Sequence, residues 1–303
     1  LRKINKIIAS NVIKKFKIND NAVFKFIFEQ LSLNKKLSID DLGYLIGPII
    51  NSGGRLGFSN YGVELLTTDN LKLIKKRSIE LIKLNEKRKL LEQNILDQIN
   101  YEKINKNNNK VIIYYNANLN EGLIGIIAAR IKDYFNKPSI VITKSNNILK
   151  ASARSTSNYN IGNLIKLLID KKIIENGGGH NMAAGFSIKK NKLKSLNEFI
   201  QKDYSFKILN TNLSYKYESE VSASTINIKF MDEINKLGPF GNHNFMPIFM
   251  IRNVKIIKSS IVNKKHISAI VKPNTGSSFK SICFNSVNTQ VGNYLLTNKK
   301  QID

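Results

Sequence analysis

Residues 148–188 are ILKASARSTSNYNIGNLIKLLIDKKIIENGGGHNMAAGFSI, and their pattern indicates the fold class. Ile148–Arg154 is predicted as a strand, Ile161–Asp170 as a helix, and Phe186–Ile188 as part of another strand. Strands that alternate with helices predict an α/β domain whose sheet is covered by helices. The alternation continues on both sides, with strands predicted at Val111–Tyr115 and Ser139–Thr143 and helices at Glu121–Phe135 and Lys190–Tyr204.

Upstream of this domain the sequence predicts short helices over residues 1–45, then a loop, then one long helix. The stretch GPIINSGGRLG at residues 47–57 contains too much glycine and proline for a helix interior, so a loop holding Asn51 and Arg55 is predicted. Residues 70–103 predict a helix that suits a connector between two domains. Its narrow apolar stripe consists of Ile74, Leu81, Leu84, Leu91, Ile95 and Ile99.

Downstream of residue 210, short strand-like runs dominate the sequence, and one helix is predicted at Ile226–Leu237. A small barrel of this kind is compatible with an OB-fold, which is a common single-strand-binding module. The predicted strands are Leu213–Val221, Ile248–Ile257, His266–Val271 and Phe279–Phe284.

The charge balance favours a polyanionic partner. Lys and Arg total 48 against 22 Asp and Glu, a formal net charge of +26, and such a field most often attracts nucleic acid. The chain is also rich in Ile and Asn, as AT-rich coding produces, so an ordinary lysine-rich surface is the competing interpretation. Lysines interrupt the N-terminal apolar run and no apolar stretch reaches roughly 18 residues, so neither a signal peptide nor a membrane span is predicted. The single cysteine, Cys283, fits a reducing cytoplasm.

Two motifs have the composition of phosphate-binding sites. In Ala151–Ser155 (ASARS), small residues allow close approach of a phosphate, Arg154 can contact it with two N–H groups, and Ser152 and Ser155 can donate further hydrogen bonds. In Asn176–Gly185 (NGGGHNMAAG), the three glycines Gly177, Gly178 and Gly179 allow several backbone N–H groups to face one anion, and His180 follows as a further donor.

Each motif also has an ordinary structural interpretation. Three glycines are typical of a turn between a helix and a strand, and one histidine or arginine is often a structural residue. Two such loops in one small domain favour a joint site at one edge of the sheet. Arg55 is expected to complete a cationic cluster there from across the connector. No metal site is predicted, because His180, His243 and His266 lie far apart in the sequence without paired carboxylates. The chain alone is therefore expected to bind and not to cut.

The motifs together resemble the RecJ-type single-stranded-DNA-specific exonucleases of the DHH phosphoesterase superfamily. Residues 47–56 are similar to a signature near the end of their catalytic domain, and Glu121–Arg130 (EGLIGIIAAR) to the first helix of their DHH-associated domain. Ser152–Ser155 and Gly177–Gly185 resemble the nucleic-acid-contacting motifs of that domain, and Gly238–Gly241 (GPFG) resembles the turn before their OB-fold strands.

The resemblance implies a 5′-to-3′ exonuclease that hydrolyses single-stranded DNA with Mn²⁺ or Mg²⁺ in recombination and repair. It implies that Asn51, Arg55, Ser152, Arg154, Ser155 and the three glycines bind the strand, and that His180 lies beside the scissile phosphate as a catalytic residue. Four domains are expected: a catalytic-domain remnant (1–69), a connector helix (70–106), a DHH-associated domain (107–205) and a truncated OB-fold (206–303). The expected protein is a cytoplasmic monomer, with a helicase and a single-strand-binding protein as candidate partners.

Departures from the family leave two alternatives open. The metal-binding motifs that name the superfamily are absent and are expected before Leu1, so the sequence is interpreted as a C-terminal fragment. Leu119-Asn120 stands where many members have Trp-His. The alternatives are a phosphoesterase for oligonucleotides or cyclic dinucleotides, which usually lacks an OB-fold, and a non-enzymatic single-strand-binding module.

Overall fold

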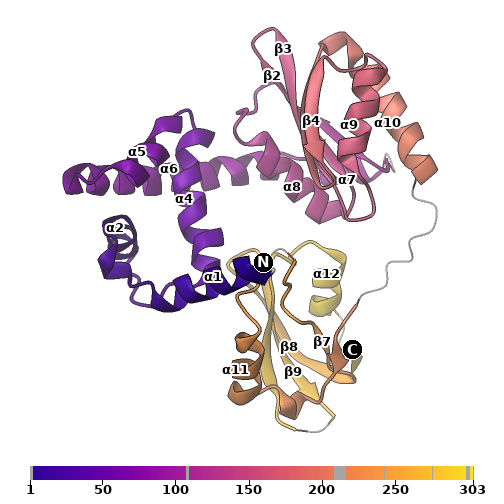
Figure 1. The fold of residues 1–303 in the computed structure, drawn as a ribbon. Coiled ribbons are helices and arrows are strands. Elements are labelled where there is room, and N and C mark those ends of the chain that lie inside the picture. The colour runs from indigo at the N-terminus through magenta and orange to yellow at the C-terminus, as the bar shows by residue number, and fades with distance from the viewer. Residues whose placement is uncertain are drawn as a thin grey trace. The chain divides into compact units, whose positions relative to one another are not determined.

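A computed structural model describes residues 3–106, 109–207, 216–241, 243–274, 276–297 and 301–302. The chain divides into two compact units, one of residues 16–212 and one of residues 1–15 together with 213–303. Figure 1 shows the helices and strands of both units. None of these helices is long and apolar enough to cross a membrane.

The first unit begins with helices that precede the sheet. Three residues separate the long α6 (Leu71–Asp97) from α7 (Tyr101–Lys106), so the predicted helix over 70–103 is two helices. Asn70 caps α6 by accepting from the amides of Lys72 and Leu73. The shorter elements are η1 (Ile18–Asp20), α2 (Ala22–Gln30), α3 (Ile39–Asp41), η2 (Leu42–Ile46), α4 (Gly47–Arg55) and α5 (Ser59–Thr67).

The predicted loop at residues 47–57 is wrong, because residues 47–55 form helix α4. Pro48 lies in the first turn of α4, directly after the π-helical turn η2. Gly53 is buried where α4 packs on α6, and a Cβ there would lie 3.0 Å from Leu81 Cδ2. The buried Ser52 hydroxyl donates to the Leu81 carbonyl oxygen at 2.9 Å. The glycine and serine of this stretch therefore permit close helix packing.

A five-stranded sheet in the order β1-β2-β3-β5-β4 forms the body of the first unit. Only the β1–β2 pair is parallel. Helix α8 contacts β2 and β3, whereas α9 contacts β4 and β5, and α10 shares the apolar core of α9. The prediction of a helix-covered α/β sheet is confirmed (Figure 1). The elements are β1 (Ile112–Tyr115), α8 (Ile124–Phe135), β2 (Ser139–Ser145), β3 (Ile148–Arg154), α9 (Ile161–Asp170), β4 (Asn176–His180), β5 (Ala183–Ile188), η3 (Lys190–Lys192) and α10 (Leu193–Lys207).

The glycine-rich motif, interpreted as a loop, lies mainly in strands, whereas Ile148–Arg154 is a strand as predicted. Ala151–Arg154 is the end of β3, and the glycine-rich motif is the β4–β5 hairpin, with a turn at residues 181–182. None of Gly177, Gly178 and Gly179 has a positive φ. These three glycines are extended residues of strand β4. A Cβ on Gly179 would lie 2.6 Å from the Ala184 Cα, so this glycine allows the hairpin to close tightly.

The second unit contains an antiparallel sheet in the order β10-β9-β8-β11 and a parallel β6–β7 pair. Within the described residues these strands do not close into a barrel, although the predicted strand-rich character is confirmed. Residues 213–215 of the first predicted strand lie outside the described residues. The elements are α1 (Lys3–Lys15), β6 (Ser219–Glu220), η4 (Ala223–Thr225), α11 (Ile228–Lys236), β7 (Phe249–Met250), β8 (Val254–Val262), β9 (His266–Pro273), β10 (Phe279–Cys283), α12 (Gln290–Thr297) and β11 (Gln301–Ile302).

Candidate nucleic-acid interface

Strand register brings the two sequence motifs onto one face of the sheet. Along β3 the side chains of Leu149, Ala151 and Ala153 are buried in the core, so the intervening residues point to the opposite side. We call this side the site face. It consists of three rows across β3, β5 and β4: Arg154, Ala183 and His180; Ser152, Gly185 and Gly178; Lys150, Ser187 and Asn176.

The middle of the site face is formed by small residues, because β5 contributes only alanine, glycine and serine to it. Arg154 and His180 stand two strands apart in one row, which places their Cα atoms about 10 Å from each other. Arg154 is the last residue of β3 and His180 is the last residue of β4, so both lie at the same end of the sheet. His180 lies on the exposed edge strand β4, but Arg154 lies two strands inward on the face.

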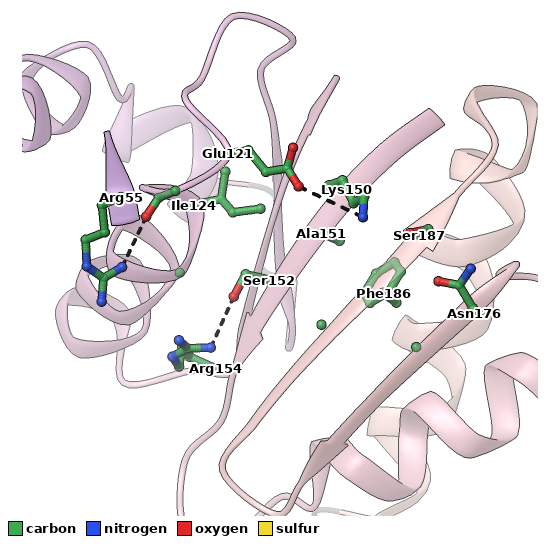
Figure 2. Close-up of a pocket in the computed structure, with 14 residues that line it drawn as sticks. Arg55, Glu121, Ile124, Lys150, Ala151, Ser152, Arg154, Asn176, Phe186 and Ser187 are labelled. Atoms are coloured by element: carbon green, nitrogen blue, oxygen red, sulfur yellow. Dashed lines mark hydrogen bonds and ion pairs between the residues drawn. The ribbon is translucent and has the colours of Figure 1, made fainter. Parts of the chain in front are cut away.

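A pocket of about 500 Å³ lies on this face beside the N-terminus of α8. Figure 2 shows the guanidinium groups of Arg55 and Arg154 at one end, with Asn176 and Ser187 at the other. The first-turn amides of a helix have no intrahelical acceptor and favour anions, so α8 adds to the positive potential there. The lining residues are Arg55, Glu121, Gly122, Ile124, Gly125, Lys150, Ala151, Ser152, Arg154, Asn176, Gly177, Gly185, Phe186 and Ser187.

Arg154 is held at the pocket wall by its own strand. One guanidinium nitrogen, Nη1, donates to the Ser152 hydroxyl at 3.1 Å and to the Ala153 carbonyl oxygen at 2.8 Å. A Cβ on Gly125, in the first turn of α8, would lie 3.0 Å from Nη2 of this arginine. Gly125 therefore leaves the space that the guanidinium needs. Burial lowers the pKa of Arg154, and the neighbouring charge of Arg55 lowers it further.

Arg55 reaches the same pocket from the last turn of α4. Its Nη1 donates to the Gly122 carbonyl oxygen at 3.1 Å (Figure 2). Burial lowers the pKa of Arg55, Arg88 lowers it further, and Glu92 opposes both effects. Among the described residues no carboxylate lies within ion-pair distance of Arg55 or Arg154. Two partly buried like charges without an ion-paired carboxylate are the arrangement expected of an anion-binding site.

Only some of the predicted site residues line the pocket. Of the predicted set, Arg55, Ser152, Arg154 and Gly177 line the pocket. Asn51 is exposed on α4, one turn before Arg55. Ser155 is buried, and its hydroxyl donates to the Tyr159 carbonyl oxygen at 2.6 Å, so it supports the loop after β3 and not the pocket. Gly178, Gly179 and His180 lie on β4 outside the pocket lining.

Sequence reasoning missed several pocket residues that the strand period can identify. Lys150 precedes Ser152 and Arg154 by two-residue steps, so it belongs to the same side of β3. Glu121 accepts from the Ser145 hydroxyl at 2.8 Å and lies 4.0 Å from Lys150 Nζ. No pattern in the sequence signals that Gly122 and Gly125 face the two arginines, because those contacts join distant segments.

The described residues contain no group of three or more His, Cys, Asp or Glu side chains that can hold a metal ion. The chemistry that the described pocket offers is therefore cationic and hydrogen-bonding, and Mn²⁺ or Mg²⁺ has no fitting ligand set among these residues.

Two family models match the chain. Residues 108–205 match the DHHA1 domain and residues 217–303 match the RecJ OB domain. The RecJ single-stranded-DNA-specific exonuclease of Salmonella typhimurium is 28% identical over 262 residues, which cover 83% of this chain and 45% of that protein. The Bacillus subtilis RecJ exonuclease is 25% identical, over 84% of this chain and 33% of that protein. The chain thus spans less than half the length of these curated relatives.

A solved structure of RecJ from Thermus thermophilus with Mn²⁺ has a TM-score of 0.69 at 18% identity, and the match covers 84% of this chain and 39% of that one. A similar match is found to its Mg²⁺ complex. At this identity the likeness shows the fold. Together with the two domain models and the curated relatives, it confirms the resemblance to the RecJ-type exonucleases and the predicted fold class of a DHH-associated domain followed by an OB domain.

Proposed function

We propose that this chain is the strand-binding part of a RecJ-type exonuclease, which hydrolyses phosphodiester bonds of single-stranded DNA from the 5′ end in recombination and repair. The observation that carries this proposal is the pocket at the start of α8, where Arg55 and Arg154 meet without a carboxylate partner among the described residues. The names of the curated relatives and the two matched domains support the substrate class.

In this proposal the two arginines bind backbone phosphates, and Ser152 donates a further hydrogen bond. Contacts to phosphate and stacking of bases need no sequence readout, which suits an enzyme that degrades any strand. The glycines of β4 and β5 allow the strand to approach the sheet backbone closely, and Asn51 borders the path from α4. His180 stands beside the phosphate to be cleaved, in the same row as Arg154.

Hydrolysis itself is assigned to the whole enzyme. Related RecJ structures contain Mn²⁺ or Mg²⁺, and we propose that a divalent metal serves the full-length protein through ligands outside the described residues. No step of metal-dependent hydrolysis is assigned to this chain. We further propose a cytoplasmic monomer, for which helicases and single-strand-binding proteins are the candidate partners.

The proposed division of labour follows four segments. Residues 1–69 complete the catalytic domain and supply Arg55, and residues 70–106 connect it to the DHH-associated domain at 107–205. Residues 206–303 form the OB domain, whose family binds single strands in many proteins. The two arginines of the pocket thus come from different segments, one before the connector and one after it.

The direct test measures binding of this chain to a fluorescent single strand and to its duplex over a salt series. We expect the single strand to bind more tightly, with an affinity that falls as salt rises by a slope of about −0.7 per phosphate neutralised. The test uses fluorescence anisotropy in EDTA, which removes any metal-dependent cleavage. Equal affinity for duplex and single strand would contradict the proposal and indicate a generic basic surface.

A further inference from the structure

A buried ionic network lies behind the pocket, at the junction of α6 and α8. Glu92 of α6 is only 6% exposed. Its Oε2 accepts from Arg88 Nη1 at 2.7 Å, and its Oε1 accepts from Arg130 Nε of α8 at 2.7 Å. Asn85 Oδ1 accepts two further hydrogen bonds from Arg88, at 3.1 and 3.0 Å. One carboxylate oxygen of Glu92 therefore bonds within α6, and the other joins α6 to α8.

The network connects to Arg55 through packed helices. Helix α4, which ends at Arg55, is fixed on α6 by the buried Ser52 hydroxyl and by the close approach at Gly53. Helix α6 is tied to α8 by the Glu92–Arg130 ion pair. The N-terminus of α8 lies beside Arg154 and follows Gly122, whose carbonyl oxygen accepts from Arg55.

In the described structure, two polar links fix the relative position of the two pocket arginines, in addition to the apolar packing of Ile95 and Leu96 of α6 against α8. One is the hydrogen bond from Arg55 to Gly122, at the pocket itself. The other is the Glu92–Arg130 pair, which lies outside the pocket lining. A side chain tied to neighbouring structure keeps a binding geometry that a mobile arginine would lose.

We infer that Glu92 is a positioning residue for strand binding, which holds α6 against α8 so that Arg55 stays opposite Arg154. This role rests on the proposed function, because it assumes that the two arginines bind one strand. Glu92 touches no substrate in this assignment and acts through Arg130 and Arg88.

Because Glu92 is charged, the direction in which its neutralisation changes the affinity for DNA tests this inference. Glu92 lies close enough to Arg55 to oppose the lowering of its pKa. If its role were only electrostatic, its neutralisation would remove a negative charge near a phosphate site and tighten DNA binding. If it positions Arg55, the same substitution releases the helix junction and weakens binding. The two accounts therefore predict opposite directions.

The experiment compares Glu92→Gln with Glu86→Gln in the whole chain. Glu86 is an exposed residue of the same helix, so its substitution makes the same change of charge without touching the network. We expect Glu92→Gln to weaken single-strand binding by roughly threefold to thirtyfold, and Glu86→Gln to leave it unchanged or slightly tighter. In an Arg55→Ala background, Glu92→Gln should cause little further loss, because the residue that it positions is absent.

Circular dichroism and thermal melting show whether Glu92→Gln still folds. A second variant tests the inference even if Glu92→Gln does not fold. Arg130 is half exposed, so Arg130→Gln removes the ion pair between α6 and α8 and leaves no unpaired buried charge at position 130. It should weaken binding more than Lys132→Gln, which removes an equal charge from the same helix. Tighter binding by Glu92→Gln, or equal losses in the wild-type and Arg55→Ala backgrounds, would overturn the inference. If the wild-type chain shows no single-strand preference, the proposed function itself has failed.

Discussion

Replacing Arg154 by alanine is expected to weaken single-strand binding by roughly tenfold to 150-fold, equivalent to about 1.5–3 kcal/mol for hydrogen bonds with a charged partner. The guanidinium is oriented by the Ser152 hydroxyl and the Ala153 carbonyl oxygen, so it meets a phosphate without first being ordered. The slope of affinity against salt should also become shallower by about 0.7 for one lost phosphate contact. Anisotropy titrations of the wild type and the variant measure both quantities.

Two controls separate this contact from the general charge of the chain. Arg154→Lys keeps the positive charge but loses the planar pair of donors, so it should recover only part of the affinity. Lys132→Ala removes a charge from α8 outside the pocket lining and should have a small effect. If the Arg154→Ala variant binds the strand as tightly as the Lys132→Ala variant, Arg154 does not contribute to strand binding.

Gly122→Ala is expected to lower the stability of the chain by about 1–3 kcal/mol through overpacking and to weaken strand binding as well. A Cβ on Gly122 would lie 2.8 Å from the backbone Cα and carbonyl carbon of Arg55. Backbone atoms cannot rotate away, so α4 and the segment before α8 must separate. The hydrogen bond from Arg55 to the Gly122 carbonyl would then be lengthened or lost. Thermal melting and anisotropy measure the two effects.

Gly54→Ala is the matched control for this substitution. Gly54 precedes Arg55 in α4, and a Cβ there meets nothing within 4 Å. Alanine is the better helix former, so this variant should be as stable as the wild type or slightly more stable. If Gly122→Ala melts and binds like Gly54→Ala, the close contact between Gly122 and Arg55 does not determine the pocket.

The sheet and its helices were predictable because their signals are local. Ile148–Arg154 and Ile161–Asp170 were predicted with the bounds that the structure has. Side-chain alternation in β3 also explains why Ser152 and Arg154 share one side of the sheet. Helix α4 was not predictable in this way, since glycine and proline content argues for a loop unless the packing of Gly53 on α6 is known.

The missed features depend on contacts between distant segments. The three glycines of β4 are extended because β5 closes against them, and no local pattern distinguishes this from a turn. On α6 the predicted stripe continued through Leu84 and Leu91, but the buried positions after Leu81 are Asn85, Arg88 and Glu92. These polar residues have the three- and four-residue spacing of a core stripe, and that spacing was the available signal of a buried network.

In the proposed function, Arg55 and Arg154, which lie on either side of the long connector, bind one strand as a single site. A double-mutant cycle of Arg55→Ala, Arg154→Ala and the combined variant, each titrated with the same labelled single strand, measures whether they do. We predict that the double variant loses less than the sum of the single losses, with a coupling of about 0.5–3 kcal/mol. Losses that add within about 0.3 kcal/mol would show that the two arginines act independently and would contradict the claim.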